Sequence, residues 1–155
     1  MRVHYHTFGC KANQYDTERM RQELEARGAE TVADGTVADV VVLNTCTVTN
    51  QADAQARRAV RRIQRANPDA RVGVAGCSAA LLAREYAEMR GVAEVVPGHD
   101  PVQVALATVP RPSGLVSLGL NRSLDRLDTE PVGGELLRTR EAGTRGWLKI
   151  QDGCD

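Results

Sequence analysis

The sequence predicts an α/β protein with an open, mostly parallel β-sheet and helices on both faces of that sheet. Two runs, DVVVLN at residues 39–44 and RVGVA at residues 71–75, are almost continuously apolar, which is typical of central parallel strands covered on both faces. Segments with helical periodicity separate these runs from each other and from further short strands. Hydrophobic residues make up 42% of the chain but aromatic residues only 3%, so the core must be mainly aliphatic and rich in alanine.

The first elements of the predicted fold are a strand, a helix and a weak second strand. Residues 3–8 are rich in β-branched and aromatic side chains, which favours a strand. A helix follows, for which Asn13 and Asp16 resemble a capping box and Gly28 gives an end signal. A short strand is expected over residues 29–32, before the buried strand DVVVLN.

The later elements continue the alternation. A helix is expected over residues 50–66, because Asn67-Pro68-Asp69 stops it. After the strand RVGVA, a helix from Ser78 to Gly91 is expected, with Ser78 as its N-cap. Residues 92–96 favour a strand, and Asp100-Pro101 begins a last helix. The Ser78 helix carries one apolar stripe, made of Leu82, Tyr86 and Met89.

The chain is expected to have three parts. Residues 1–108 would form the α/β domain. Residues 109–144 are expected to be a connector, because the periodicity fades and Pro and Gly recur. Residues 145–155 contain the alternating sequence WLKI, which is typical of a strand that begins a second domain, cut short here.

Charge and hydropathy limit the classes of protein to which the chain can belong. Twenty Lys and Arg residues balance twenty Asp and Glu residues, which argues against a generally basic nucleic-acid-binding domain. The N-terminus has no apolar signal region and no apolar run approaches membrane length, so we expect a cytoplasmic protein with no membrane partner. In that reducing compartment the four cysteines are expected to be metal or redox ligands rather than disulfides.

Three of the cysteines follow predicted strands. Cys10, Cys46 and Cys77 each lie one to three residues beyond the carboxyl end of a strand. In a flavodoxin-like strand order, 2-1-3-4-5, the strands concerned are direct neighbours, about 4.8 Å apart, and their carboxyl ends share one edge of the sheet. The three thiols would then converge within roughly 10 Å, a span that an iron–sulfur cluster can bridge.

The residues beside these cysteines suit a ligand role. Gly9 and Gly76 can bring backbone N–H groups close to sulfur, because glycine has no Cβ. Each cysteine also lies just before a predicted helix, whose N-terminal dipole favours a thiolate. Three thiolates would leave one iron of a four-iron cluster open, by analogy with catalytic metal sites. Scattered buried thiols, zinc binding and a redox disulfide are the alternatives, although no CxxC spacing supports a zinc ribbon.

Four blocks of sequence around the cysteines resemble the N-terminal part of the methylthiotransferases of the radical S-adenosylmethionine superfamily: TFGCKANQYDTE, VVVLNTCTVTNQAD, VAGC and LKIQDGC. The pieces GCKANQYD, NTCTVTNQAD and LKIQDGCD are most similar to the branch that inserts sulfur at carbon 2 of N6-threonylcarbamoyladenosine, next to the tRNA anticodon, and methylates it. The alternatives are the branches that modify isopentenyladenosine in tRNA or an aspartate of a ribosomal protein, and a stand-alone iron–sulfur or zinc-binding module.

The resemblance also implies cofactors and partners. Cys10, Cys46 and Cys77 match the ligands of an auxiliary [4Fe–4S] cluster, and Cys154 matches the first cysteine of the CxxxCxxC motif that binds a second [4Fe–4S] cluster, which cleaves S-adenosylmethionine. The full-length enzyme would act on the tRNA anticodon loop and take electrons from a flavodoxin- or ferredoxin-type donor. We expect the chain alone to be inactive, because that motif is cut after its first ligand. The sequence does not indicate an oligomeric state.

The sequence departs from the family pattern after the third cysteine. Relatives often have an aromatic residue followed by Gln or Glu at this point, whereas this chain has Ser78-Ala79-Ala80. We therefore expect the surroundings of the third ligand to be smaller and less polar than in those relatives.

Arginines, histidines and the tryptophan have weaker functional interpretations. His4 and His6 share one face of a strand, and with no matching carboxylate we expect them to pack rather than to bind metal. His99 is a loop histidine with no evident partner, and Trp147 is expected to anchor the strand that enters the next domain. A basic stripe on the helix over residues 50–66 is more typical of a solvated face than of a tRNA contact; it consists of Arg57, Arg58, Arg61, Arg62 and Arg65.

Overall fold

The apolar runs of the sequence form the centre of an all-parallel, five-stranded β-sheet. The computed structural model describes residues 1–47 and 50–109. The strands are β1 (Arg2–Thr7), β2 (Glu30–Thr31), β3 (Val40–Thr45), β4 (Arg71–Gly76) and β5 (Val92–Pro97). Their order across the sheet is β2-β1-β3-β4-β5, and each neighbouring pair is parallel, so the predicted flavodoxin-like order is confirmed.

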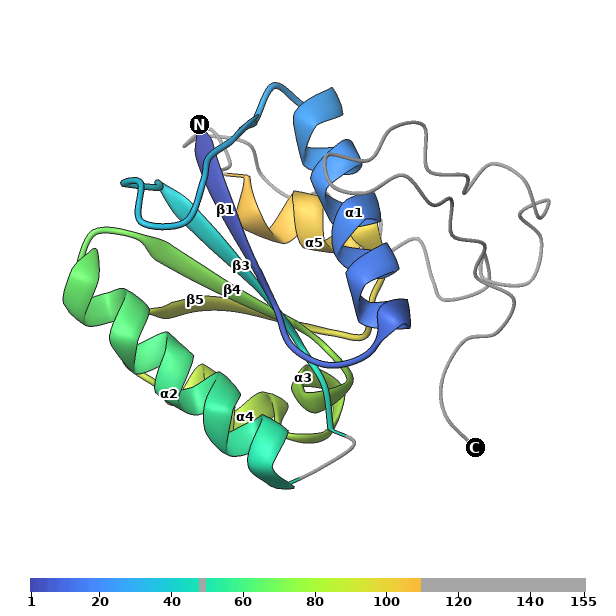
Figure 1. The fold of residues 1–155 in the computed structure, drawn as a ribbon, viewed down its shortest axis with the longest axis vertical. Coiled ribbons are helices and arrows are strands. Elements are labelled where there is room, and N and C mark those ends of the chain that lie inside the picture. The colour runs from blue at the N-terminus through green and yellow to red at the C-terminus, as the bar shows by residue number, and fades with distance from the viewer. Residues whose placement is uncertain (48–49, 110–155) are drawn as a thin grey trace, which may run out of the picture.

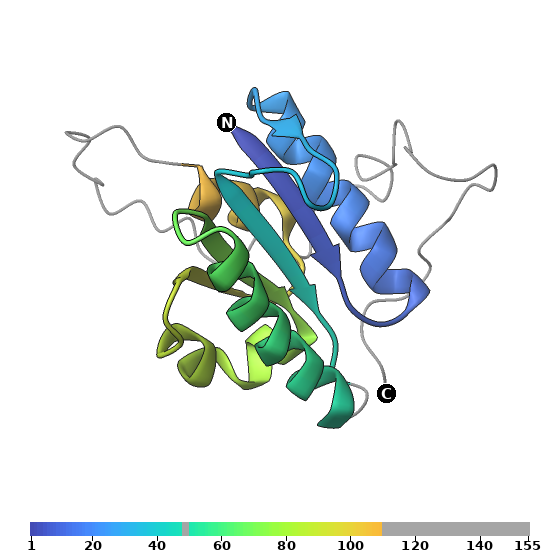
Figure 2. The same ribbon diagram turned by 60° about the vertical axis from the view of Figure 1, so that its left-hand side comes forward.

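Helices cover both faces of the sheet, as Figure 1 shows. Those in the described residues are α1 (Lys11–Ala26), α2 (Asn50–Ala66), α3 (Cys77–Leu81), α4 (Ala83–Ala87) and α5 (Pro101–Thr108). Helices α1 and α5 lie on one face, and α2, α3 and α4 lie on the other, which is also visible in the turned view (Figure 2). The predicted α/β architecture with helices on both faces is therefore confirmed.

The core consists of aliphatic layers on the two faces of the sheet. Successive residues of a strand point to opposite faces, so Val40 and Val42 of β3 pack with α1 and α5, while Leu43 packs with α2 and α4. This double burial explains why the β3 segment is continuously apolar. Each fully buried valine or leucine contributes about 1.5–3 kcal/mol relative to an exposed one.

The boundaries of α1 were predicted correctly at its end and wrongly at its start. The helix begins at Lys11 with Cys10 as its N-cap, and Asn13 lies inside it rather than capping it. Asn13 lies in the first turn of the helix, and its side-chain amide donates to the backbone oxygens of Phe8 and Thr45, at 2.8 and 3.0 Å. At the other end, Gly28 has a φ of 84°, and its N–H donates to the Glu25 carbonyl at 2.9 Å, as expected of a glycine that terminates a helix.

The single helix predicted from Ser78 to Gly91 is wrong, because the chain breaks at Leu82 into α3 and α4. Ser78 does not cap a helix, since its hydroxyl is buried and already engaged. That hydroxyl donates to Asp53 at 2.6 Å and lies 2.9 Å from the Tyr86 hydroxyl. Burial raises the pKa of Tyr86, so this phenol remains a neutral partner. The predicted apolar stripe is confirmed, because Leu82, Tyr86 and Met89 pack in one cluster.

The start of the last helix is as predicted. The Asp100 carboxylate accepts hydrogen bonds from the backbone N–H groups of Val102 and Gln103, at 2.8 and 3.2 Å, and Pro101 occupies the first turn. The expected connector, the strand at Trp147 and Cys154 lie outside the described residues. Within residues 1–47 and 50–109, no helix has both the length and the apolar character needed to span a membrane.

The two histidines of β1 pack along one face of the sheet. The His6 ring contacts Phe8 edge-on at a centroid distance of 4.7 Å, and His4 Nδ1 donates a hydrogen bond to the Val32 carbonyl at 3.3 Å. The expectation that no carboxylate accompanies the pair is wrong, because Asp34 lies 3.6 Å from His4. The ring contacts of His6 with His4 and Phe8 show the expected packing along this face.

We predict that His6 makes the fold less stable in mild acid. Burial lowers the pKa of His6 below its ordinary value of 6.5, and the positive charges of Arg62 and His4 lower it further, against an opposing contribution from Asp34. Protonation therefore favours the unfolded chain, so the free energy of unfolding should be highest above pH 6.5 and should fall as the pH drops below that value. Urea unfolding at pH 8 and pH 5.5 should show a smaller difference for His6→Gln than for the wild type; equal differences would contradict the prediction.

Candidate functional site

Three cysteines lie at the carboxyl edge of the three central strands. Cys46 directly follows β3, Cys77 directly follows β4, and Cys10 lies three residues beyond Thr7, the last residue of β1. Thr45 pairs with Gly76 in the sheet, so Cys46 and Cys77 leave neighbouring strands at the same level. The three cysteines therefore follow neighbouring strands that end at one edge of the sheet, as predicted.

Gly9 brings the loop that carries Cys10 directly against Cys46. Its φ is 102°, a conformation that glycine adopts without the strain imposed by a side chain. A Cβ added at Gly9 would lie 2.5 Å from Cys46 Cβ and 2.7 Å from Cys46 Sγ. The absence of a side chain at Gly9 therefore lets the segment before Cys10 lie directly against Cys46.

Gly76 makes a similar close approach between β4 and β3. Its φ is 97°, and an added Cβ would lie 2.5 Å from Asn44 Oδ1 and 2.7 Å from the Thr45 nitrogen. Only glycine allows the chain to turn here into α3 while it remains pressed against the end of β3. This turn sets the position of Cys77, the first residue of α3.

A buried polar network supports the same edge. The Asn44 amide donates to the Asn13 carbonyl at 2.9 Å and to the Thr17 hydroxyl at 3.0 Å. The Asn13 amide in turn holds the backbone oxygens of Phe8 and Thr45, which flank the cysteine loops. Buried amides are costly unless they are hydrogen-bonded, so these bonds fix the loops in place. Sequence reasoning missed this role; the available signal was a polar residue, Asn44, ending an otherwise apolar strand.

The three thiols differ in exposure and in their relation to helices. Cys46 is buried, with 3% of its surface exposed, Cys77 is partly buried, and Cys10 is exposed. The prediction that each cysteine lies just before a helix is right for Cys10, the N-cap of α1. It is wrong for Cys77, which is itself the first residue of the five-residue α3, and α2 begins four residues after Cys46. The site is therefore closed beneath Cys46 and open at Cys10.

His99 reaches this edge from the end of β5. Its Nε2 lies 3.3 Å from Cys77 Sγ, and its Nδ1 lies 3.3 Å from a carboxylate oxygen of Asp16 in α1. The contact at Nδ1 is a charge contact rather than an aligned hydrogen bond. The expectation that His99 has no partner is wrong. The rule that placed the cysteines could have found it, because His99 follows the carboxyl end of β5 at the same edge.

The thiols suit a cluster better than a single ion. The described residues contain no group of three or more His, Cys, Asp or Glu side chains placed to hold one metal ion. An iron–sulfur cluster takes each thiolate on a different iron and so bridges a wider span. The three free cysteines at this edge supply the soft sulfur ligands that such a group requires.

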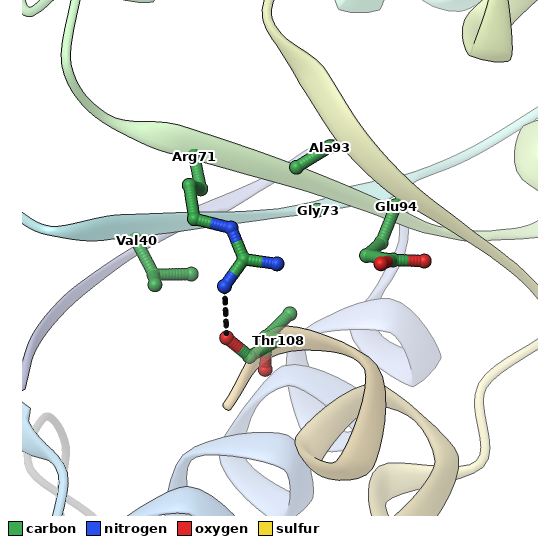
Figure 3. Close-up of a pocket in the computed structure, with 6 residues that line it drawn as sticks. All are labelled: Val40, Arg71, Gly73, Ala93, Glu94 and Thr108. Atoms are coloured by element: carbon green, nitrogen blue, oxygen red, sulfur yellow. Dashed lines mark hydrogen bonds between the residues drawn. The ribbon is translucent and has the colours of Figure 1, made fainter. Parts of the chain in front are cut away.

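A small hollow elsewhere in the fold does not contribute to this site. It lies near the amino-terminal ends of β3 and β4 (Figure 3). Arg71 donates to the Thr108 carbonyl across it at 3.4 Å, and none of its lining residues is a cysteine. A Cβ at Gly73 would lie 2.8 Å from the Thr108 side chain, so this glycine serves the packing of α5 on the sheet.

Comparisons with known proteins agree on one family. The model of the uncharacterized protein family UPF0004 matches residues 2–98. The chain is 33% identical over its whole length to threonylcarbamoyladenosine tRNA methylthiotransferase MtaB of Aquifex aeolicus, of which it covers 37%. It is 34% identical, over 99% of its length, to the protein of the same name from Bacillus subtilis, of which it covers 34%. It is also 30% identical to tRNA-2-methylthio-N(6)-dimethylallyladenosine synthase of Fervidobacterium nodosum, of which it covers 34%. The chain thus spans about a third of the length of these relatives.

We predict that Gly9→Ala destabilises the fold more than Gly28→Ala does. Both glycines have a positive φ, so both substitutions carry a strain of about 1–3 kcal/mol. Only at Gly9 does the new methyl group also collide with Cys46, whereas nothing lies within 4 Å of a Cβ at Gly28. Urea unfolding of the two variants measures the difference, and equal losses of stability would show that the loop before Cys10 is not packed on Cys46.

Proposed function

The chain belongs to the methylthiotransferase family, and on this basis we propose that it is the N-terminal part of a tRNA methylthiotransferase and holds an iron–sulfur cluster through Cys10, Cys46 and Cys77. The observation that carries the proposal is the convergence of these cysteines at one edge of β1, β3 and β4. The UPF0004 match over residues 2–98 covers all three, and the names of the relatives supply the kind of reaction.

Cys46 and Cys10 would bind the cluster from opposite sides, one buried and one exposed. Cys46, which is buried, would anchor the inner side of the cluster, away from water. Cys10 lies on the open side, on a loop that Asn13 holds through the Phe8 carbonyl. With three thiolates and no fourth protein ligand, one iron would remain accessible.

The chemistry that we propose belongs to the full-length protein. When bound, the cluster would supply the sulfur atom for insertion at carbon 2 of N6-threonylcarbamoyladenosine, with S-adenosylmethionine as radical source and methyl donor. Cys154 would be the first ligand of a second cluster, and an external flavodoxin or ferredoxin would supply electrons. These roles rest on the sequence resemblance and on the names of the relatives. The contribution of the described residues is to bind, orient and partly bury the first cluster.

The proposed ligand set predicts the iron content of cysteine variants. After anaerobic reconstitution with iron and sulfide, the wild-type chain should hold about four iron atoms with broad visible absorption. Cys46→Ala should lose most of both, because the remaining thiols cannot close the buried side of the site. Cys154→Ala is the matched control and should keep the wild-type iron content. Unchanged iron in Cys46→Ala, or binding of zinc in place of iron, would refute the three-cysteine cluster.

The proposed substrate predicts which nucleoside is modified in cells. A strain that lacks this gene should contain N6-threonylcarbamoyladenosine without the methylthio group, and the full-length gene should restore it. Mass spectrometry of digested tRNA gives the measurement, and a full-length Cys10→Ala variant serves as the negative control. Restoration of a methylthiolated dimethylallyladenosine, or of a methylthiolated ribosomal protein, would instead assign the protein to another branch of the family.

A further inference from the structure

We propose that His99, held by Asp16, donates a hydrogen bond to the sulfur of Cys77 and thereby positions and electronically tunes this cluster ligand. The inference rests on the proposed cluster-binding function and adds a positioning residue to it. Three separate elements meet here, since Asp16 belongs to α1, Cys77 begins α3, and His99 follows β5.

The His99 ring lies between the Asp16 carboxylate and the Cys77 sulfur. His99 Nε2 is 3.3 Å from Cys77 Sγ, within hydrogen-bonding distance of sulfur, and His99 Nδ1 is 3.3 Å from Asp16 Oδ2. The Asp16 side chain is 6% exposed and the His99 side chain 23% exposed, so water competes only weakly for these contacts. The sulfur of Cys77 can accept a hydrogen bond from an N–H at Nε2.

The backbone is fixed one residue before each of the two partners. The Gly76 N–H donates to the Gly98 carbonyl at 2.7 Å, in an isolated antiparallel bridge between the exits of β4 and β5. Cys77 and His99 are the next residues on the two sides of this bridge. Gly98 has a φ of 94°, so its turn also requires a glycine-like conformation. The imidazole therefore reaches the sulfur because the chain is fixed one residue earlier on both sides.

This group of side chains is not arranged to hold a metal ion. The two ring nitrogens of His99 point in opposite directions, one to Cys77 and one to Asp16, so one ion cannot bind both partners and the ring. The described residues accordingly contain no group of three such side chains able to hold one ion. The arrangement instead resembles the outer contacts that orient a metal ligand.

The proposed contact compensates for the small residues that follow Cys77. Ser78-Ala79-Ala80 offers no long polar side chain, and the Ser78 hydroxyl is engaged by Asp53 and Tyr86 on the far side. His99 supplies a polar partner to the sulfur from another strand. A hydrogen bond withdraws negative charge from a ligating thiolate and stabilises the reduced, more negative cluster. Its loss should therefore shift the reduction potential to more negative values.

The test is a potentiometric titration of the reconstituted cluster at one fixed pH, followed by electron paramagnetic resonance. His99→Phe removes the donor, and its potential should be more negative than that of the wild type. Asp16→Asn removes the charge that orients the ring and should shift the potential in the same direction by a smaller amount. His99→Asn keeps a side-chain N–H donor and should lie between His99→Phe and the wild type. His4→Phe is the matched control and should leave the potential unchanged, because His4 contacts Val32 and Asp34 and no cysteine.

Each outcome separates this inference from the proposed function. Unchanged potentials in both His99→Phe and Asp16→Asn, with full iron content, would overturn the role of His99 while leaving the cluster in place. A folded wild-type chain that binds no iron would overturn the proposed function and this inference together. If circular dichroism shows that His99→Phe does not fold, His99→Asn and Asp16→Asn decide the matter by the same criterion.

Discussion

In-register parallel pairing of β1, β3 and β4 is the constraint on which the candidate site depends. Because Thr45 pairs with Gly76, and Thr7 with Asn44, the three strands end at almost the same level and their exits lie side by side. A slip of one residue would exchange the faces of every side chain in a strand, so burial of both faces fixes this register. The positions of the cysteines thus follow from the packing of a valine-rich sheet, before any cofactor is considered.

Close approach at the strand exits then requires exceptional residues. Gly9 and Gly76 remove side chains where the backbone would collide, and Asn13 and Asn44 satisfy the polar groups that this approach buries. This arrangement reduces conformational freedom and removes polar groups from water, and both effects are unfavourable. A plain apolar edge would stabilise the fold at least as well. The physical consequence of this arrangement is a rigid edge that presents three sulfurs and one imidazole, which favours a binding role over simple packing.

The order of the strands and the edge that carries the cysteines could be predicted from the sequence, because period and apolar runs report burial directly. The helix boundaries near Asn13 and Ser78 could not be predicted. Both residues have side chains that are typical of helix caps, but here these side chains form tertiary hydrogen bonds. Likewise His99 was assigned no partner, because its contacts come from Asp16 and Cys77, which are remote in sequence. Local patterns identify a polar group, and only the fold identifies what it meets.

His99 shows that a polar contact to a cysteine can come from a neighbouring strand instead of from the residues that follow the cysteine in sequence. Residues directly after a cysteine are near it because they are adjacent in the chain. His99 is near Cys77 because the hydrogen bond between Gly76 and Gly98 holds the two chain segments together. The second route needs a turn of fixed shape at Gly98 and a buried carboxylate at Asp16, so it depends on three elements at once. Changes in any of them would alter the surroundings of one sulfur while Cys10 and Cys46 keep theirs. The edge would therefore allow Cys77, as the proposed third ligand, to be tuned independently of the other two cysteines.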